Sequence, residues 1–349
     1  MKTRIAAGVV AGLVALMLAQ PGQAQEAATG ADAVCAGRNL IETLHDEARA
    51  KLDAAVEGVP YAQGILWRAE RGAARLYLVG TYHFDDPRHA QTLAAVGTTL
   101  ADAQALLVEA GPEEEAQLQA ALTRDPSLIV DAEGPTLRAR LSDAEWQALS
   151  VAMADRGIAG VITAQLRPWY VSVMLSLSPC MIAQARSGAG EGGLDARMIA
   201  AAEAAKVPVI ALEPWDTMFT LFAELPPEQE LDMIRVAVPG ASLADDYAVT
   251  LADAYFAGDV WILWEFGRLE SHALSDLDAA TIDAQIDLAR ERLMDARNRD
   301  WIAPLTRAAE DAAGQGGHVV AAFGALHLPG EAGVLRLLEQ DGWTISVWE

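Results

Sequence analysis

Short apolar runs that stop at a glycine or a glutamate constrain the fold of this chain more than any other feature. Four such runs are residues 74–79, 105–108, 207–212 and 318–323. Each has the length of a strand and is too short for an ordinary helix. Helical spacing of apolar residues fills segments between them, for example at 88–105 and 196–205. Strands that alternate with helices predict an α/β fold with a central mixed sheet.

Two more strands are expected beside these runs. Residues 64–70 precede the run at 74–79 across Arg71-Gly72, which signals a hairpin. Near the other end, a helical pattern at 330–340 leads into a β-like run at 343–348. A helical pattern at 35–56 lies in front of the hairpin. The order is that of one sheet with helices inserted between its strands.

Two long segments between the strand runs are helical by pattern. They are residues 112–180, and residues 221–298, which are rich in acidic residues and include Trp261 and Trp264. No linker divides the chain into independent units. We therefore predict one domain over residues 35–349, in which these two segments form a large helical insertion or cap.

The first residues have the pattern of a cleaved secretory signal. Two basic residues precede an apolar run at 5–19, and Gly22-Gln23-Ala24 fits a small-x-small cleavage site. This predicts a signal peptide at 1–24, a disordered lead-in at 25–34, and export to the periplasm or the medium. The alternative is an uncleaved anchor, although the run is short for a transmembrane helix. No later run is long and apolar enough to span a bilayer, so no membrane contact is expected after cleavage.

Charge and cysteine content narrow the partners and the compartment. A formal net charge of −24 argues against binding to nucleic acid or to anionic membranes. The chain has two cysteines, Cys35 and Cys180. An even pair in an exported protein predicts a Cys35–Cys180 disulfide, and two buried free thiols are the alternative. Oligomeric state cannot be read from these features.

The motif Gly-x-x-His occurs twice, as Gly80-Thr81-Tyr82-His83 and as Gly324-Ala325-Leu326-His327. With 6 histidines and 28 glycines in 349 residues, about half of one such motif is expected by chance. Each copy follows an apolar strand run and precedes a helical pattern. The shared context is that of a pseudo-duplicated β-loop-α unit.

Side chains that bind metals or move protons collect where the predicted strands end. They are His83, Glu109, Glu213 and His327, and Asp195 stands just before a predicted helix. Ligand sites in α/β sheets gather at the carboxyl ends of strands. Two imidazoles with one or two carboxylates suit a divalent metal, which would activate a bound water while a spare carboxylate acts as the base. The same groups also suit metal-free proton transfer, and each histidine alone suits a structural role.

Arg297 and Asn298 end a long helical pattern. A guanidinium there suits an oxyanion or carboxylate clamp at the site, and a role at the helix end is the alternative.

Several of these segments together resemble one family. They are Gly80 to His83, the strand-end Glu109, Gly193-Leu194-Asp195, Val207 to Glu213, Arg297-Asn298, and Gly324 to Gly330. The chain resembles the TraB/GumN family over roughly residues 35–348. This family shares its two Gly-x-x-His motifs and a strand-end Glu with the TIKI proteins, which are described as divalent-metal-dependent proteases. The wider superfamily includes erythromycin-esterase-like and ChaN-like proteins, and the resemblance implies their fold.

The resemblance implies a metal site made of His83, Glu109 and His327, with Asp195 as a further ligand. The expected cofactor is Mn, Co or Zn. Glu213 and Arg297 join Glu109 as expected catalytic residues. The implied function is an exported, metal-dependent, peptidase-like hydrolase that acts on a peptide or a small molecule.

Two alternatives stay open beside the metal-dependent hydrolase. One is a non-catalytic protein that holds a peptide or small ligand under the cap, and the other is a metal-independent esterase-like hydrolase. One departure from the family pattern is Tyr82, where an aliphatic residue is more usual. A tyrosine there suits either a proton donor or a residue that fills the pocket.

Overall fold

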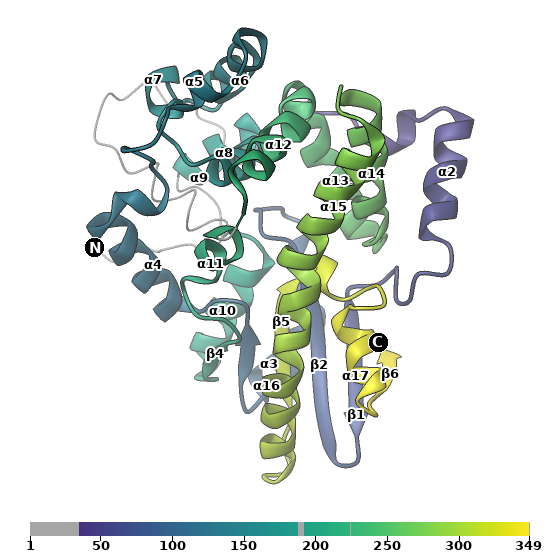
Figure 1. Ribbon diagram of the computed structural model, residues 1–349. Helices are drawn as coiled ribbons and strands as arrows, with labels where there is room; N and C mark the ends of the chain where they lie inside the picture. The colour runs from purple at the N-terminus through teal and green to yellow at the C-terminus, as the bar shows by residue number, and fades with distance from the viewer. Residues whose placement is uncertain (1–34, 188–191, 224, 349) are drawn as a thin grey trace.

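Six strands form one mixed sheet in the order β4-β3-β5-β2-β1-β6 (Figure 1). The strands are β1 (Leu66–Arg71), β2 (Ala74–Thr81), β3 (Leu106–Val108), β4 (Val209–Ala211), β5 (Val319–Gly324) and β6 (Thr344–Val347). The computed structural model describes residues 35–187, 192–223 and 225–348. The predicted signal peptide and lead-in lie outside these residues. The mixed α/β sheet predicted from the sequence is confirmed.

The predicted hairpin at the start of the sheet is present. Strands β1 and β2 pair antiparallel, with Arg71 opposite Ala74. Gly72 makes the turn with φ +61°, a backbone conformation that side chains with a Cβ rarely adopt. Strand β6 pairs antiparallel with β1 and is the last strand on that side of the sheet.

Strand β2 is also part of a parallel group of four, which lie in the order β4, β3, β5 and β2. Every residue of β5 is buried, as expected of a central parallel strand covered on both faces. Its register with β2 sets Gly80 opposite Phe323 and Thr81 opposite Gly324. The two Gly-x-x-His motifs are far apart in sequence, but they therefore start side by side at the carboxyl ends of β2 and β5.

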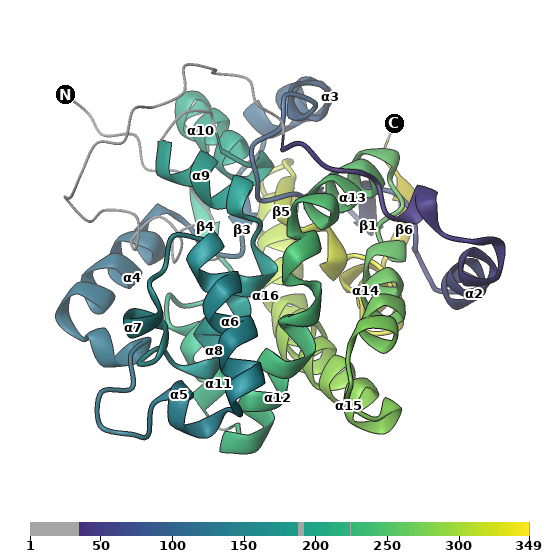
Figure 2. The ribbon, with the colours of Figure 1, turned by 90° about the horizontal axis from the view of Figure 1, so that it is seen from above.

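Helices cover both faces of the sheet (Figure 2). Alternate residues of a strand point to opposite faces, so Leu78 belongs to one core cluster and Val79 to the other. The first cluster is completed by α16 (Ala296–Ala313) and α17 (Val334–Gln340). The second is completed by α3 (His89–Ala101) and α10 (Leu194–Ala205).

The remaining helices gather beyond the carboxyl ends of the parallel strands (Figure 1). From the first cap segment come α4 (Pro112–Arg124), η2 (Pro126–Leu128), α5 (Leu137–Arg140), α6 (Asp143–Asp155), α7 (Gly160–Thr163), α8 (Pro168–Ser176) and α9 (Pro179–Ser187). From the second come α11 (Thr217–Ala223), α12 (Pro227–Ala237), η3 (Pro239–Leu243), α13 (Ala244–Ala257), α14 (Ile262–Leu274) and α15 (Ala279–Arg290).

The two cap segments share one hydrophobic core. Trp169 of α8 stacks on Phe222 of α11, with ring centroids 5.2 Å apart and planes 6° from parallel. Arg156 lies inside the cap with 1% of its surface exposed and donates to four main-chain carbonyls near the ends of α6 and α8. The side chain of Arg156 therefore satisfies carbonyls that a helix end leaves without partners.

The predicted N-terminal helix is shorter than the pattern suggested. A 3₁₀ turn, η1 (Ile41–Thr43), is followed by α2 (Asp46–Val56). Leu44 is extended between them, and the His45 ring accepts the Ala48 N–H at 3.2 Å as the cap of α2. The predicted Cys35–Cys180 disulfide is present, with Cα atoms 5.7 Å apart, and joins the segment before η1 to α9.

The helix that carries Arg297 and Asn298 does not end there, so that prediction was wrong. A π-helical turn, η4 (Glu291–Asp295), follows α15, and Arg297 and Asn298 lie in the first turn of α16. The helix continues through Pro304 because its apolar stripe, which includes Trp301 and Leu305, packs on the sheet. Among the described residues, no helix combines the length and apolar character that crossing a bilayer requires.

Candidate active site

Four of the predicted site residues lie just after the carboxyl ends of the four parallel strands. Glu109 follows β3 directly, and Glu213 comes two residues after β4. His83 comes two residues after β2, and His327 ends η5 (Ala325–His327), the 3₁₀ turn that follows β5. Parallel neighbours end at the same edge, so side chains separated by long stretches of sequence meet there.

Gly324 is the point at which three of these side chains meet. A Cβ on this residue would lie 3.2 Å from Glu109 Oε1, 3.2 Å from His83 Nε2 and 3.5 Å from His327 Cδ2. The Gly324 N–H also donates to Glu109 Oε1 at 2.6 Å. A larger residue at this position would push Glu109 and His83 outward by a few tenths of an ångström, so glycine favours their close approach to the end of β5.

Gly193 has a similar role next to the first motif. A Cβ there would collide with the main chain of His83. The close approach places the start of α10 against the His83 loop, where the Leu194 N–H donates to Tyr82 O at 3.0 Å. As a result Asp195, in the first turn of α10, reaches the His83 ring.

The His83 ring is held from behind by Asp195. Its Nδ1 lies 2.8 Å from Asp195 Oδ2, and the other carboxylate oxygen accepts the Thr81 hydroxyl at 2.5 Å. An ionised carboxylate only accepts, so Nδ1 carries the hydrogen and Nε2 faces Gly324. Burial disfavours the charged ring, but the negative charges of Asp195 and Glu109 outweigh it and raise the pKa of His83 to about 9.

The His327 ring is held in the same way by an amide. Its Nδ1 lies 2.6 Å from Asn298 Oδ1, and Asn298 Nδ2 donates to Ala332 O at 2.9 Å. That second bond assigns the amide orientation, so Nδ1 is the donor and Nε2 keeps a lone pair. Burial, together with the positive charge of Arg297, lowers the pKa of His327 to about 3. The two motif histidines therefore rest in opposite protonation states near neutral pH.

Arg297 holds the two strand-end glutamates together. Its Nη2 donates to Glu109 Oε2 at 2.8 Å and to Glu213 Oε2 at 2.9 Å, and its Nε donates to Glu213 Oε1 at 2.6 Å. The Trp301 indole donates to the same Glu213 oxygen at 2.9 Å. The pKa of Glu109 is lowered because Arg297, the histidines and the Gly324 N–H outweigh its burial. The pKa of Glu213 is raised because burial outweighs Arg297.

The sequence did not point to Thr81 and Trp301 as part of this site. Thr81 lies inside the first Gly-x-x-His motif, which was the available signal. Trp301 lies one helical turn after Arg297, a spacing that places both on one face of α16. Tyr82 packs into an aromatic cluster, with its ring centroid 5.4 Å from that of Tyr255, and burial raises its pKa.

A divalent metal ion is the cofactor that these residue types suggest. Both rings are held from behind, as metal-bound histidines usually are. Arg297, however, donates to Glu109 and lies 3.4 Å from His327 Nε2, and its fixed charge opposes a second cation. Within the described ranges, no three His, Cys, Asp or Glu side chains are placed to hold a metal ion. In this arrangement the residues do not fit a metal ion, and the predicted ligand set stays a prediction.

The fold and the site together define a class of protein. A mixed sheet brings two Gly-x-x-His motifs and a strand-end glutamate to one edge, beneath a helical cap. The chain belongs to the TraB/PrgY/gumN family, which it matches over residues 65–347. No curated protein and no solved structure matches the chain. The wider superfamily and the pseudo-duplication stay predictions.

Proposed function

We propose that the protein is a hydrolase that cleaves an ester or amide bond, with His83 as the general base. The observation that carries this proposal is the meeting of His83 Nε2, Glu109 Oε1 and the His327 ring around Gly324. Each ring is oriented by a side chain behind it, which is the arrangement a proton-transfer group needs. The site lies at the strand ends beneath the cap, where a substrate can be shielded from bulk water.

In this proposal a water molecule is held between the two rings. His83 must first lose its resting proton to solvent, so only the fraction of the protein with a neutral His83 ring is active below pH 9. In that fraction His327 accepts one O–H group of the water at Nε2, and His83 takes the proton of the other as the oxygen attacks the carbonyl carbon. Asp195 and Glu109 stabilise the imidazolium that forms. His83 then returns the proton to the leaving oxygen or nitrogen, so each turnover consumes one water and leaves the enzyme unchanged.

Arg297 acts on Glu109 rather than on the water. Its bonds to Glu109 and Glu213 fix the Glu109 carboxylate beside His83 and cancel part of the negative charge gathered there. Burial keeps His327 neutral and the charge of Arg297 adds to that effect, so the His327 ring stays an acceptor and does not compete for the proton.

Metal-dependent hydrolysis is the second candidate, favoured by the two imidazoles that converge beside Glu109. It requires the Arg297 side chain to leave Glu109. We further propose that the protein works after export, on a peptide or small molecule, as the N-terminal sequence pattern suggests.

The test is a screen of ester and peptide substrates with purified protein, its His83→Gln and His327→Gln variants, and an exposed-histidine control, His272→Gln. Metal-free hydrolysis is expected to survive chelator treatment, to fall by about 100-fold or more in both site variants, and to be unchanged in the control. With His83 as the base, kcat/KM should rise about tenfold per pH unit up to pH 9.

Three outcomes would contradict the proposal. Activity that disappears with chelator and returns with Mn, Co or Zn would support the second candidate instead. Retained activity in His83→Gln would exclude His83 as the base. Ligand retention without turnover, unaffected by either variant, would identify a binding protein.

A further inference from the structure

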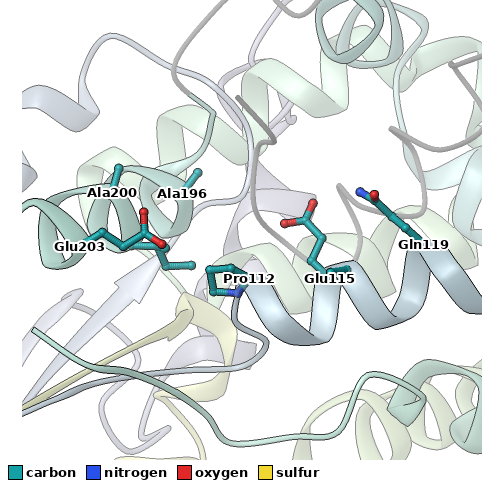
Figure 3. A pocket seen from close by; sticks show the side chains of 8 residues that line it. Pro112, Glu115, Gln119, Ala196, Ala200 and Glu203 are labelled. Carbon is teal, nitrogen blue, oxygen red and sulfur yellow. The ribbon is translucent and has the colours of Figure 1, made fainter. Parts of the chain in front are cut away.

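A groove between α4 and α10 lies outside the site described above (Figure 3). Its volume is about 180 Å³. It is lined by Pro112, Glu115, Ala116, Gln119, Ala196, Ile199, Ala200 and Glu203. These side chains are spaced as one face of each helix, and several are small, which leaves the space open. Within the part of the chain that the structure describes, the lining holds two carboxylates and no lysine or arginine.

Glu115 is a buried acid, and among the described residues nothing pairs with its Oε1. Only 9% of its surface is exposed, and its Oε1 is buried with no hydrogen-bond partner. Burial raises the pKa of Glu115 to about 7. A buried carboxylate normally has a cation or several donors around it, because an unpaired one costs stability. A groove that contains such a group is therefore suited to a ligand that brings the missing donors.

Glu203 supplies a second, more exposed carboxylate at the same groove. In Figure 3 the Glu115 carboxylate projects from α4, and Glu203 lies beside Ala196 and Ala200 of α10, with Pro112 between the two acids. Glu203 lies in the last turn of α10, where main-chain carbonyls also favour a positive charge. The Glu203 end of the groove thus attracts cations, whereas Glu115 lies in the first turn of α4, so at the other end the attraction comes from its carboxylate alone.

We propose that this groove binds a primary alkylammonium group, with Glu115 as the inner contact and Glu203 as the outer one. A compact ammonium offers three hydrogen-bond donors and a point charge, which suit an enclosed carboxylate. The alkyl part would lie along the alanine side chains of the lining. The same chemistry occurs in free diamines and in the lysine side chains of peptides.

The groove adjoins the candidate active site through both of its helices. Helix α4 begins three residues after Glu109, and the first turn of α10 contains Asp195. The ammonium site goes beyond the proposed hydrolysis and is tested by binding alone. A failed binding test would therefore leave the proposed hydrolysis untouched.

The experiment is calorimetric titration of the intact protein with 1,5-diaminopentane and with its neutral counterpart, 1,5-pentanediol. We expect the diamine to bind and the diol not to bind. Glu115→Gln should weaken diamine binding by about tenfold or more, because it removes the buried countercharge. Ala200→Trp, which fills the exposed side of the groove, should abolish binding. The matched control is Glu113→Gln, an exposed acid on the same helix, which should change affinity less than about twofold.

A lysine-containing tripeptide amide distinguishes the two sources of the ammonium group. Tighter binding of the peptide than of the diamine would assign the groove to peptides, and the reverse would assign it to free amines. The proposal is overturned if the diol binds as tightly as the diamine, or if neither amine binds at millimolar concentration. It is also overturned if Glu113→Gln weakens binding as much as Glu115→Gln does, since that would reflect surface charge alone.

Discussion

Replacing Arg297 with methionine should destabilise the protein strongly, because it leaves two carboxylates without their cation. The Arg297 side chain is 12% exposed, and those of its partners Glu109 and Glu213 are 15% and 9% exposed. Methionine keeps most of the aliphatic stem and removes all three hydrogen bonds to these acids. Breaking a buried pair from one side costs about 3–5 kcal/mol. Urea unfolding at pH 7 measures this loss directly.

A control on the same helix makes the Arg297 measurement specific. Arg299 pairs with Glu291 at the surface, where the two side chains are 48% and 53% exposed. Arg299→Met should therefore cost less than about 1 kcal/mol. The double variant Arg297→Met/Glu213→Gln should recover about 1–2 kcal/mol, since one of the two uncompensated charges is then removed.

Lowering the pH should reduce the difference in unfolding free energy between wild type and Arg297→Met. The folded pKa of Glu109 lies below its ordinary value of 4.5, so its contribution is fully present above pH 4.5 and is lost as the pH falls through the folded pKa. Without Arg297 that contribution is largely absent at every pH. A cost below about 1 kcal/mol at pH 7, or one unchanged between pH 7 and pH 3, would refute the reasoning.

Three further predictions concern other parts of the molecule. Asp195→Asn should lower the pKa of His83 from about 9, as NMR titration of the ring would show. In wild type the stability from this pair is fully present below pH 6.5 and is lost as the pH rises through about 9, so the variant's stability should vary less over that window. Arg156→Met should cost about 3 kcal/mol or more in urea unfolding, because four main-chain carbonyls lose their donor. Changing both Cys35 and Cys180 to serine should cost about 5 kcal/mol by loop entropy over 145 residues, and an unchanged melting curve would contradict that.

The sheet could be predicted because its strands carry local signals. The β1–β2 hairpin has Gly72 at a turn that needs a positive φ, and β5 is a continuous apolar run that ends at a glycine. The same signals predict where the strands end. His83, Glu109, Glu213 and His327 could therefore be expected at the carboxyl ends of the strands. Parallel strands end at the same edge whatever lies between them in sequence.

The side-chain partners within the site could not be predicted in the same way. Their positions depend on the helix that carries Arg297 and Asn298, and the π-helical turn at Glu291–Asp295 changes which face of that helix meets the sheet. One extra residue in a turn has no compositional signature. The sequence therefore indicated two histidines and nearby acids, but not that Arg297 would bind both glutamates or that Asn298 would orient His327.

The place of β5 in the sheet has a consequence for how the protein is made. This strand lies between β3 and β2, yet residues 319–324 leave the ribosome more than 200 residues after β2. Until then β2 and β3 have no strand between them, and their edges stay open to unwanted pairing. Contacts so distant in sequence also form slowly. The site can therefore form only after β5 has been synthesised. Until then the growing chain exposes strand edges that favour aggregation.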